Sequence, residues 1–169
     1  MQGKIEALKR IILFKEEPDE ILEALCKSMK IHHFKKGDLI IREGEPGNSL
    51  FIILEGDVSI TKKMTLLADD EERSDVDKAL IRLKAEQNAF FGEMALCSTG
   101  EKRSATVKAG SDCVLGEISA ETIEAVVARS PEFGVRFYKM LSRVLAERLR
   151  KANRDILKLT TVLTIALEE

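Results

Sequence analysis

The residues best suited to chemistry lie in the run FFGEMALCSTGEKRSATVK, residues 90–108. Glu93–Leu96 could form one helical turn after Gly92. Free amides at the start of such a turn attract an anion, because the helix dipole and the unpaired N–H groups add there. Arg103 follows with a planar cationic fork that suits a phosphate. Glu93 supplies an acceptor on the opposite side, suited to a sugar hydroxyl.

By themselves a glycine, a carboxylate and an arginine are a weak signal. A surface pair between Glu93 and Arg103 is the ordinary expectation for residues of these types. Whether these side chains can act together depends on the elements that position them.

The segment lies among short β-branched or apolar runs separated by glycines, a spacing that favours an antiparallel roll or barrel. The predicted strands are Asp38–Arg42, Leu50–Leu54, Asp57–Thr61, Ala79–Leu83, Ser104–Lys108 and Cys113–Ile118. The glycines at the joints are Gly37, Gly44, Gly47 and Gly56. We expect these glycines to adopt positive φ, which only glycine takes without steric cost. The acidic stretch Asp69–Asp77 predicts a mobile hairpin tip, because it has too little apolar surface to bury.

Helical patterns flank this region on both sides. Apolar residues recur at helical spacing in Ile5–Phe14 and again in Ile21–Met29, and the helical period returns after Pro131. The expected fold class is α+β: an antiparallel β-roll, a jelly-roll-like double-stranded β-helix, with short N-terminal helices and a long C-terminal helix. Residues 1–133 would form the roll with its first helices, and residues 134–169 the long helix of the same domain.

The long helix carries a narrow apolar stripe typical of a two-helix coiled coil. Its members, after the first pair, follow alternating steps of three and four: Leu145, Leu149, Ala152, Ile156, Leu159, Leu163 and Ala166. A helix of roughly 35 residues is about 50 Å long at 1.5 Å per residue, which overshoots so small a domain. We therefore expect a homodimer through Leu141 to Ala166. The alternative is that the stripe packs on the chain's own roll.

Composition limits the other possibilities. The formal charge of −2 leaves no overall basic excess for broad nucleic-acid binding. Basic residues nevertheless outnumber acids eight to two in Arg136–Lys158, so a nucleic-acid or partner surface on that helix stays open. The three cysteines share no CxxC spacing, which argues against a disulfide framework or a zinc site. No apolar run reaches membrane-spanning length and no leader is evident, so we expect a soluble cytoplasmic protein.

The same residues resemble a known family. FGEMAL, a spacer and RSATV are similar to the phosphate-binding cassette of the cyclic nucleotide-binding domain family, which has bacterial-activator and kinase-regulatory branches. Upstream, residues 37–58 (GDLIIREGEPGNSLFIILEGDV) are similar to the family's glycine-punctuated first strands. Asn88 stands where many relatives have glycine, and asparagine tolerates a left-handed turn best after glycine. With both helical ends, the resemblance spans nearly the whole chain.

The resemblance implies cAMP or cGMP as ligand, no cofactor, and an effector that the sequence does not identify. Glu93 would hold the ribose 2′-hydroxyl and Arg103 would pair with the cyclic phosphate. The remaining pocket lining would be Gly92, Met94, Ala95, Ser104 and Ala105. The Ser104 hydroxyl suits either the phosphate or a guanine amino group, so the choice of nucleotide stays open. In AERLRKAN (146–153) only Asn153 could contact the base edge, because Ala152 has no group to donate.

Three alternatives come from other classes of protein. A cupin-type enzyme would need several metal ligands inside the barrel, but the only histidines, His32 and His33, would face opposite sides of a strand. A transcription factor would need a helix-turn-helix, for which the sequence leaves no room before Glu169. A ligand-free dimerising scaffold of the same fold is disfavoured, because Glu93 and Arg103 are both present.

Overall fold

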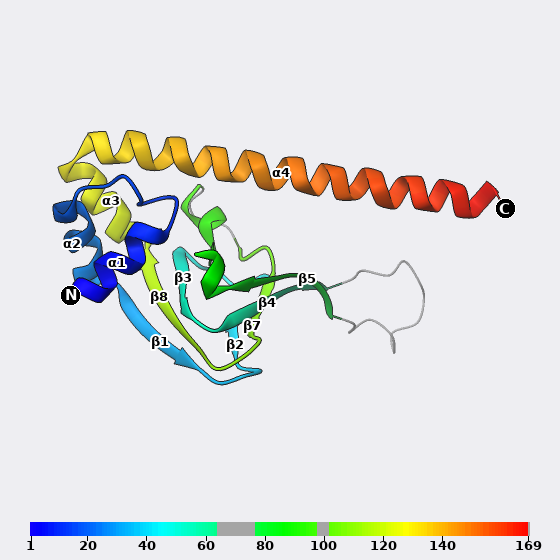
Figure 1. Cartoon of the computed structure of the whole chain (residues 1–169), viewed down its shortest axis with the longest axis horizontal. Coiled ribbons are helices and arrows are strands. Elements are labelled where there is room, and N and C mark those ends of the chain that lie inside the picture. Colours follow the sequence, from blue (N-terminus) through cyan, green and yellow to red (C-terminus); the bar gives the residue numbers. More distant parts are fainter. Residues whose placement is uncertain (64–76, 98–101, 169) are drawn as a thin grey trace.

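The computed structural model describes residues 1–63, 77–97 and 102–168 (Figure 1). Two antiparallel four-stranded sheets, ordered β1-β8-β3-β6 and β2-β7-β4-β5, form the roll. The strands are β1 Lys30–Phe34, β2 Leu39–Ile41, β3 Ser49–Glu55, β4 Asp57–Lys63, β5 Asp77–Lys84, β6 Phe90–Phe91, β7 Thr106–Ala109 and β8 Cys113–Ser119. The helices are α1 Gln2–Arg10, α2 Asp19–Ser28, α3 Ala120–Arg129 and α4 Pro131–Glu168, with the short 3-10 helices η1 Ala85–Gln87 and η2 Glu93–Leu96. The expected α+β roll with short N-terminal helices and a long C-terminal helix is confirmed.

The predicted elements did not include β1, α3 or η1, and one predicted strand is displaced. β1 (KIHHF) escaped notice because it holds a single β-branched residue, and α3 because it follows β8 without a break. The Ser119 hydroxyl caps α3 by accepting a hydrogen bond from the amide of Thr122. β7 begins at Thr106, two residues later than expected. Of the predicted acidic tip, only Asp77 lies within the described residues, where it begins β5.

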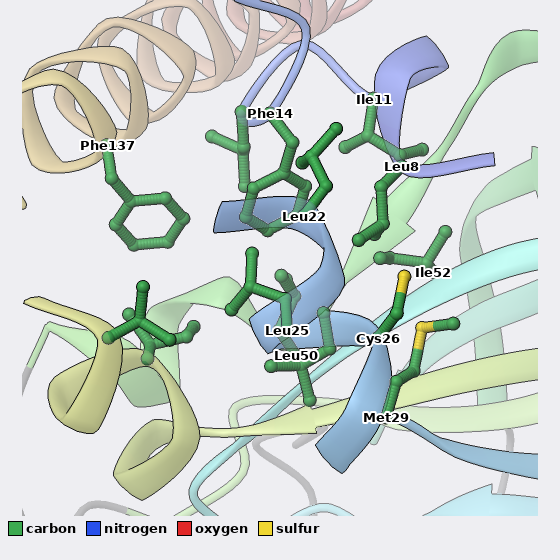
Figure 2. Close-up of a cluster of buried hydrophobic side chains, with 14 of the residues drawn as sticks. Leu8, Ile11, Phe14, Leu22, Leu25, Cys26, Met29, Leu50, Ile52 and Phe137 are labelled. Carbon is green, nitrogen blue, oxygen red and sulfur yellow. The ribbon is translucent and has the colours of Figure 1, made fainter. Parts of the chain in front are cut away.

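A helical core holds the start of α4 against the first two helices (Figure 2). Phe14 and Phe137 are fully buried and stack with their ring centroids 5.7 Å apart. Arg136 donates two hydrogen bonds to the carboxylate of Glu17, at 2.6 and 3.0 Å, and that carboxylate is buried. Because this contact is bidentate and backed by aromatic packing, the first turns of α4 are firmly placed.

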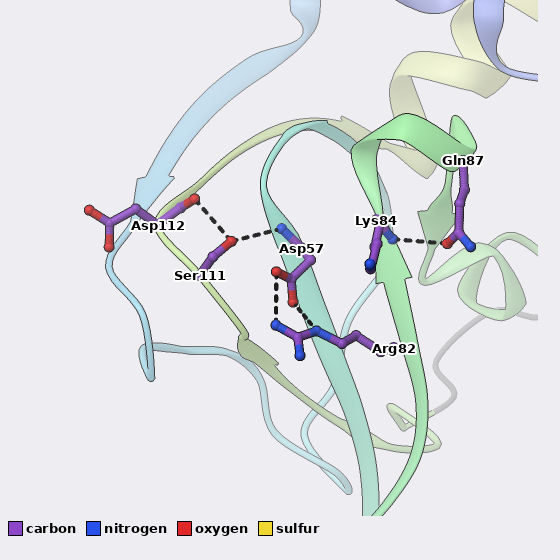
Figure 3. A network of polar contacts seen from close by, with 6 residues as sticks. All are labelled: Asp57, Arg82, Lys84, Gln87, Ser111 and Asp112. Atoms are coloured by element: carbon purple, nitrogen blue, oxygen red, sulfur yellow. Dashed lines mark hydrogen bonds and ion pairs between the residues drawn. The ribbon is translucent and has the colours of Figure 1, made fainter.

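A second core fills the space between the two sheets and includes Phe51, Phe91, Val107 and Leu115. A polar network fixes the corner where β4 begins (Figure 3). Asp57 accepts two hydrogen bonds from Arg82, at 2.6 and 3.0 Å, and the guanidinium lowers the pKa of that carboxyl. This corner sets the start of β4, the strand that leads to one wall of the cavity described below.

Backbone conformation tests the expected turns. Gly37, Gly44 and Gly56 have positive φ as predicted, but Gly47 does not, and its role proves to be steric. Asn88 takes the left-handed conformation, with φ of 50°, which confirms that asparagine supports the turn before the cassette.

The far end of α4 runs past the roll (Figure 1). Leu141 is buried in the chain's own core and Leu145 packs against it, so these two positions are already covered within one chain. The expected dimer interface cannot therefore begin at Leu141. Every residue from 147 to 167 is exposed. The large apolar side chains left uncovered there are Leu149, Ile156, Leu157, Leu159, Val162, Leu163, Ile165 and Leu167.

We predict that Phe137→Ala lowers the free energy of unfolding by about 3 to 5 kcal/mol, because it empties a packed aromatic site. Urea denaturation of the variant and the wild type measures the difference. Val135→Ala is the matched control, since Val135 lies on the same helix and is 70% exposed. Equal losses in the two variants would contradict the packing assigned to Phe137.

Candidate functional site

A cavity of about 370 Å³ lies between sheet β2-β7-β4-β5, η2 and α4. Seven of the eight residues expected from the sequence line it: Gly92, Glu93, Met94, Ala95, Arg103, Ser104 and Ala105. Segments on either side of the spacer are thus brought together at one place. The cavity also has an apolar wall that sequence reasoning missed: Ile41, Ile60, Phe91 and Val107.

The turn after Gly92 forms as predicted, as a 3-10 helix. Gly92 has φ of +80°, and a Cβ there would lie 2.7 Å from the carbonyl oxygen of Ser49. Only glycine meets both demands, the left-handed conformation and the close approach of β3. The exposed Ser104 hydroxyl faces across the cavity and donates to the sulfur of Met94 at 3.5 Å. A thioether is a weak acceptor, so this hydroxyl can exchange its partner for a ligand atom.

Arg103 is held from several sides. Its backbone pairs with the loop before β3, where its N–H donates to the carbonyl of Glu45 at 2.8 Å and its carbonyl accepts from Gly44 at 2.9 Å. Its guanidinium donates to the carbonyl and the hydroxyl oxygen of Ser49, both at 2.9 Å, and lies over the ring of Phe51. Burial lowers the pKa of Arg103, but a guanidinium stays charged at neutral pH.

Gly47 explains why this side chain can lie where it does. A Cβ at Gly47 would stand 2.0 Å from Nε of Arg103. The expectation of positive φ at Gly47 was wrong for a physical reason: the glycine is needed to leave room for the guanidinium. No local sequence signal indicates that role, because Gly47 and Arg103 are 56 positions apart in the chain.

The carboxylate of Glu93 binds a cation that was not predicted. Glu93 is buried, and Arg148 of α4 donates to its Oε1 at 2.5 Å. The same guanidinium donates to the carbonyl of Phe90 at 3.1 Å and lies over the Phe90 ring. A buried carboxylate needs such a partner, since an unpaired charge is costly away from water. The sequence shows a cation at Arg148, within AERLRKAN (146–153), but nothing in that segment indicates that it pairs with Glu93.

Asn153, the eighth expected residue, lies exposed on α4 and is not among the described residues that line the cavity. It follows Arg148 by about one and a half helical turns. A base contact from Asn153 therefore stays a prediction. The two histidines lie on β1, where Nε2 of His32 is 2.7 Å from the carboxylate of Glu117. No group of three or more potential metal ligands occurs in the parts of the chain that the structure describes.

The charges around the cavity favour an anion. Among the described residues that line it, four are cations, namely Lys62, Lys102, Arg103 and Arg148, and one, Glu93, is a carboxylate. Because Arg148 neutralises Glu93, the balance left for a ligand is positive. Together with the apolar wall, this arrangement can bind a small molecule that has an anionic group at one end and a flat apolar face at the other.

Comparison with known proteins agrees with this arrangement. A family model described as the cyclic nucleotide-binding domain matches residues 31–130. The cAMP-activated global transcriptional regulator CRP of Salmonella typhimurium is 29% identical over 135 residues, which cover 80% of this chain and 60% of the regulator. Human cGMP-dependent protein kinase 2 is 27% identical over 125 residues, 74% of this chain and 15% of the kinase. The chain thus spans only part of either relative.

A solved cyclic nucleotide-binding domain from Methylobacillus flagellatus superposes with a TM-score of 0.73 at 24% identity, covering 92% of this chain and 82% of that one. This likeness supports the fold. Within the described residues, none of the helices combines the length and the apolar composition needed to cross a membrane.

We predict that Arg148→Ala destabilises the protein by about 1 to 3 kcal/mol, the usual cost of leaving a buried polar group unsatisfied. Thermal unfolding measures the loss. Hydrogen exchange should also accelerate in α4 near residue 148, because the contact to η2 is gone. Arg150→Ala is the control, since Arg150 is exposed on the same helix. A control that matched Arg148→Ala in both measurements would contradict the anchoring role.

Proposed function

The chain belongs to the cyclic nucleotide-binding domain family, and on that premise we propose that it is a regulatory sensor of cAMP or cGMP. The observation that supports this function best is the convergence of Arg103, η2 and Glu93 on one cavity with an apolar wall. In this proposal the protein performs no chemical step on its ligand. It binds the nucleotide and passes the signal through α4 to a partner.

Each group in the cavity has a task in the proposed complex. The unused N–H groups of Arg103 pair with the cyclic phosphate, which the amides at the start of η2 also face. The purine lies against the apolar wall that Ile60 and Val107 help to form. Glu93 accepts the ribose 2′-hydroxyl through an oxygen lone pair that Arg148 leaves open. The Ser104 hydroxyl binds either the phosphate or a guanine amino group.

Signal transfer would run through Glu93, because this carboxylate meets both the ligand and α4. Arg148 ties the helix to Glu93 and to the carbonyl of Phe90. Nucleotide binding at Glu93 therefore changes the energy of the contact that holds α4 beyond Leu145. Allosteric couplings of this kind are commonly about 1 to 3 kcal/mol, and they act equally in both directions. Asn153, further along the same helix, is proposed as a base contact that adds to this coupling.

The exposed part of α4 supports a proposed parallel homodimer. Leu149, Ile156, Leu159 and Leu163 are each about 60% exposed or more, and they lie at coiled-coil seam spacing. A second copy would cover this seam, which would begin after Leu145. The effector that receives the signal is proposed to be a protein, and the basic face of α4 is open to it.

We predict that Arg103→Ala weakens cAMP and cGMP binding at least about tenfold, since truncating one member of a buried charged pair costs about 2 to 5 kcal/mol and 1.4 kcal/mol is one decade. Isothermal titration of both nucleotides measures the dissociation constants. Arg82→Ala is the control, because it removes an arginine paired with Asp57 away from the cavity. An unchanged affinity in Arg103→Ala would refute the site, and a wild type that binds neither nucleotide would favour the ligand-free dimerising scaffold.

We predict that Ile156→Asp converts the dimer into a monomer, because it places a charge in the apolar seam. Sedimentation at micromolar concentration measures the mass in solution. Arg154→Asp serves as the control, since position 154 lies about 200° around the helix from Ile156, at 100° per residue. The dimer proposal fails if the unmutated protein sediments as a monomer.

A further inference from the structure

Arg103 is the first member of a hydrogen-bond chain that leads away from the cavity. Its guanidinium donates to the hydroxyl of Ser49 at 2.9 Å. Ser49 lies on the same face of the sheet as Glu117 of the neighbouring strand, and its hydroxyl lowers the pKa of that carboxyl. Oε2 of that carboxylate is 2.7 Å from Nε2 of His32. Neither Ser49 nor Glu117 is among the described residues that line the cavity. Any effect of these two residues on a ligand in the cavity would therefore pass through Arg103.

The direction of each proton in this chain follows from the donors and acceptors present. A guanidinium has only donors, so the Ser49 oxygen must accept from Arg103. Ser49 is 3% exposed, and its one hydroxyl proton is available to the carboxylate of Glu117 on the neighbouring strand. Burial alone would raise the pKa of Glu117, but hydrogen bonds from Ser49 and His32 outweigh it and lower that pKa. Glu117 is thus an anion at neutral pH, and every proton of the chain is directed toward it.

The contacts around Ser49 link the orientation of its hydroxyl to the position of Arg103. Arg103 also donates to the Ser49 carbonyl at 2.9 Å, so both oxygens of one residue fix two nitrogens of the guanidinium. A Cβ at Gly47 or at Gly92 would crowd that guanidinium, so both positions are glycine. The ring of Phe51 lies against the same group. A hydroxyl turned by Glu117 is a stronger acceptor because hydrogen bonds in a chain polarise one another. Such a hydroxyl holds one edge of Arg103 and leaves its other N–H groups for a ligand.

We infer that Glu117, acting through the hydroxyl of Ser49, is a positioning residue that pre-orders Arg103 for the cyclic phosphate. This inference rests on the proposed function. An arginine side chain has many rotamers, and a ligand that must order it loses affinity. Ser49 and Glu117 order it before the ligand arrives. They do so from β3 and β8, which pair in register at Ser49 with Ser119 and at Phe51 with Glu117.

Matched substitutions separate the hydrogen-bond chain from simple packing. Ser49→Thr keeps the hydroxyl, whereas Ser49→Val has the same shape as that variant without it. Glu117→Gln keeps an acceptor for Ser49, whereas Glu117→Met removes it. We expect Ser49→Val and Glu117→Met to weaken cAMP and cGMP binding roughly three- to tenfold, the range that one net hydrogen bond represents, with Ser49→Thr and Glu117→Gln within about twofold of the wild type.

Isothermal titration in a double-mutant cycle supplies a readout that packing would not produce. If Ser49 acts through Arg103, Ser49→Val has no further effect in the Arg103→Ala background. An equal loss in both backgrounds would overturn the inference, as would wild-type affinity in Ser49→Val. Tighter binding by Glu117→Met would also overturn it, because the carboxylate would then compete with the phosphate. Should Glu117→Met fail to fold in a thermal melt, the serine pair decides alone.

Nucleotide binding by the wild type separates a failure of the proposed function from a failure of the positioning role. If it binds neither cAMP nor cGMP, the proposed function fails and this inference fails with it. If it binds a nucleotide and loses affinity in Arg103→Ala, while Ser49→Val leaves affinity unchanged, the site stands and only the positioning role is refuted.

Discussion

A charged guanidinium held half-buried inside a small roll is the constraint on which the rest of the site depends. In the proposed function, Arg103 must be desolvated enough to bind an anion strongly, yet an unsatisfied buried cation would cost stability. The fold resolves this with the two oxygens of Ser49 and the ring of Phe51. Two glycines, Gly47 and Gly92, leave the space, because a Cβ at either would meet the guanidinium within 3.0 Å. The loop before β3 is thus part of the proposed anion site as much as the cassette is.

A second charge links this site to the long helix. Glu93 is buried at the start of η2 and obtains its counter-ion from α4, a helix otherwise held at its first turns. Phe133, Phe137 and Leu141 anchor that beginning in the helical core. Beyond Leu145, Arg148 makes the hydrogen bonds between α4 and the roll that are seen among the described residues. α4 is thus packed at its start and exposed at its far end, with Arg148 beside the place proposed for the ligand.

One of the two hydrophobic cores supports the cavity and the other holds the long helix. The core between the sheets places Phe51, Phe91 and Val107, so it shapes the cavity wall and the platform under Arg103. The helical core places α4 and is closed by the pair of Arg136 and Glu17. A change in one core alters ligand contacts, whereas a change in the other alters how the helix is held. The polar contacts from Arg103 to His32 run from β3 across β8 to the edge strand β1, and they link the proposed anion site to that edge of the sheet.

Local sequence determined what depends on neighbours in the chain. The glycine before η2, the turn of Glu93–Leu96, the left-handed Asn88 and the helical period of α4 follow from backbone preferences and spacing. The family resemblance predicted that Glu93 and Arg103 serve one ligand. Tertiary structure alone decided which distant side chains meet. Arg148 with Glu93, Ser49 with Arg103 and the burial of Leu141 arise between segments about 50 or more residues apart, or between whole elements. No periodicity encodes such contacts, because charge pairing and desolvation act on distance in space, and that distance exists only once the roll has closed.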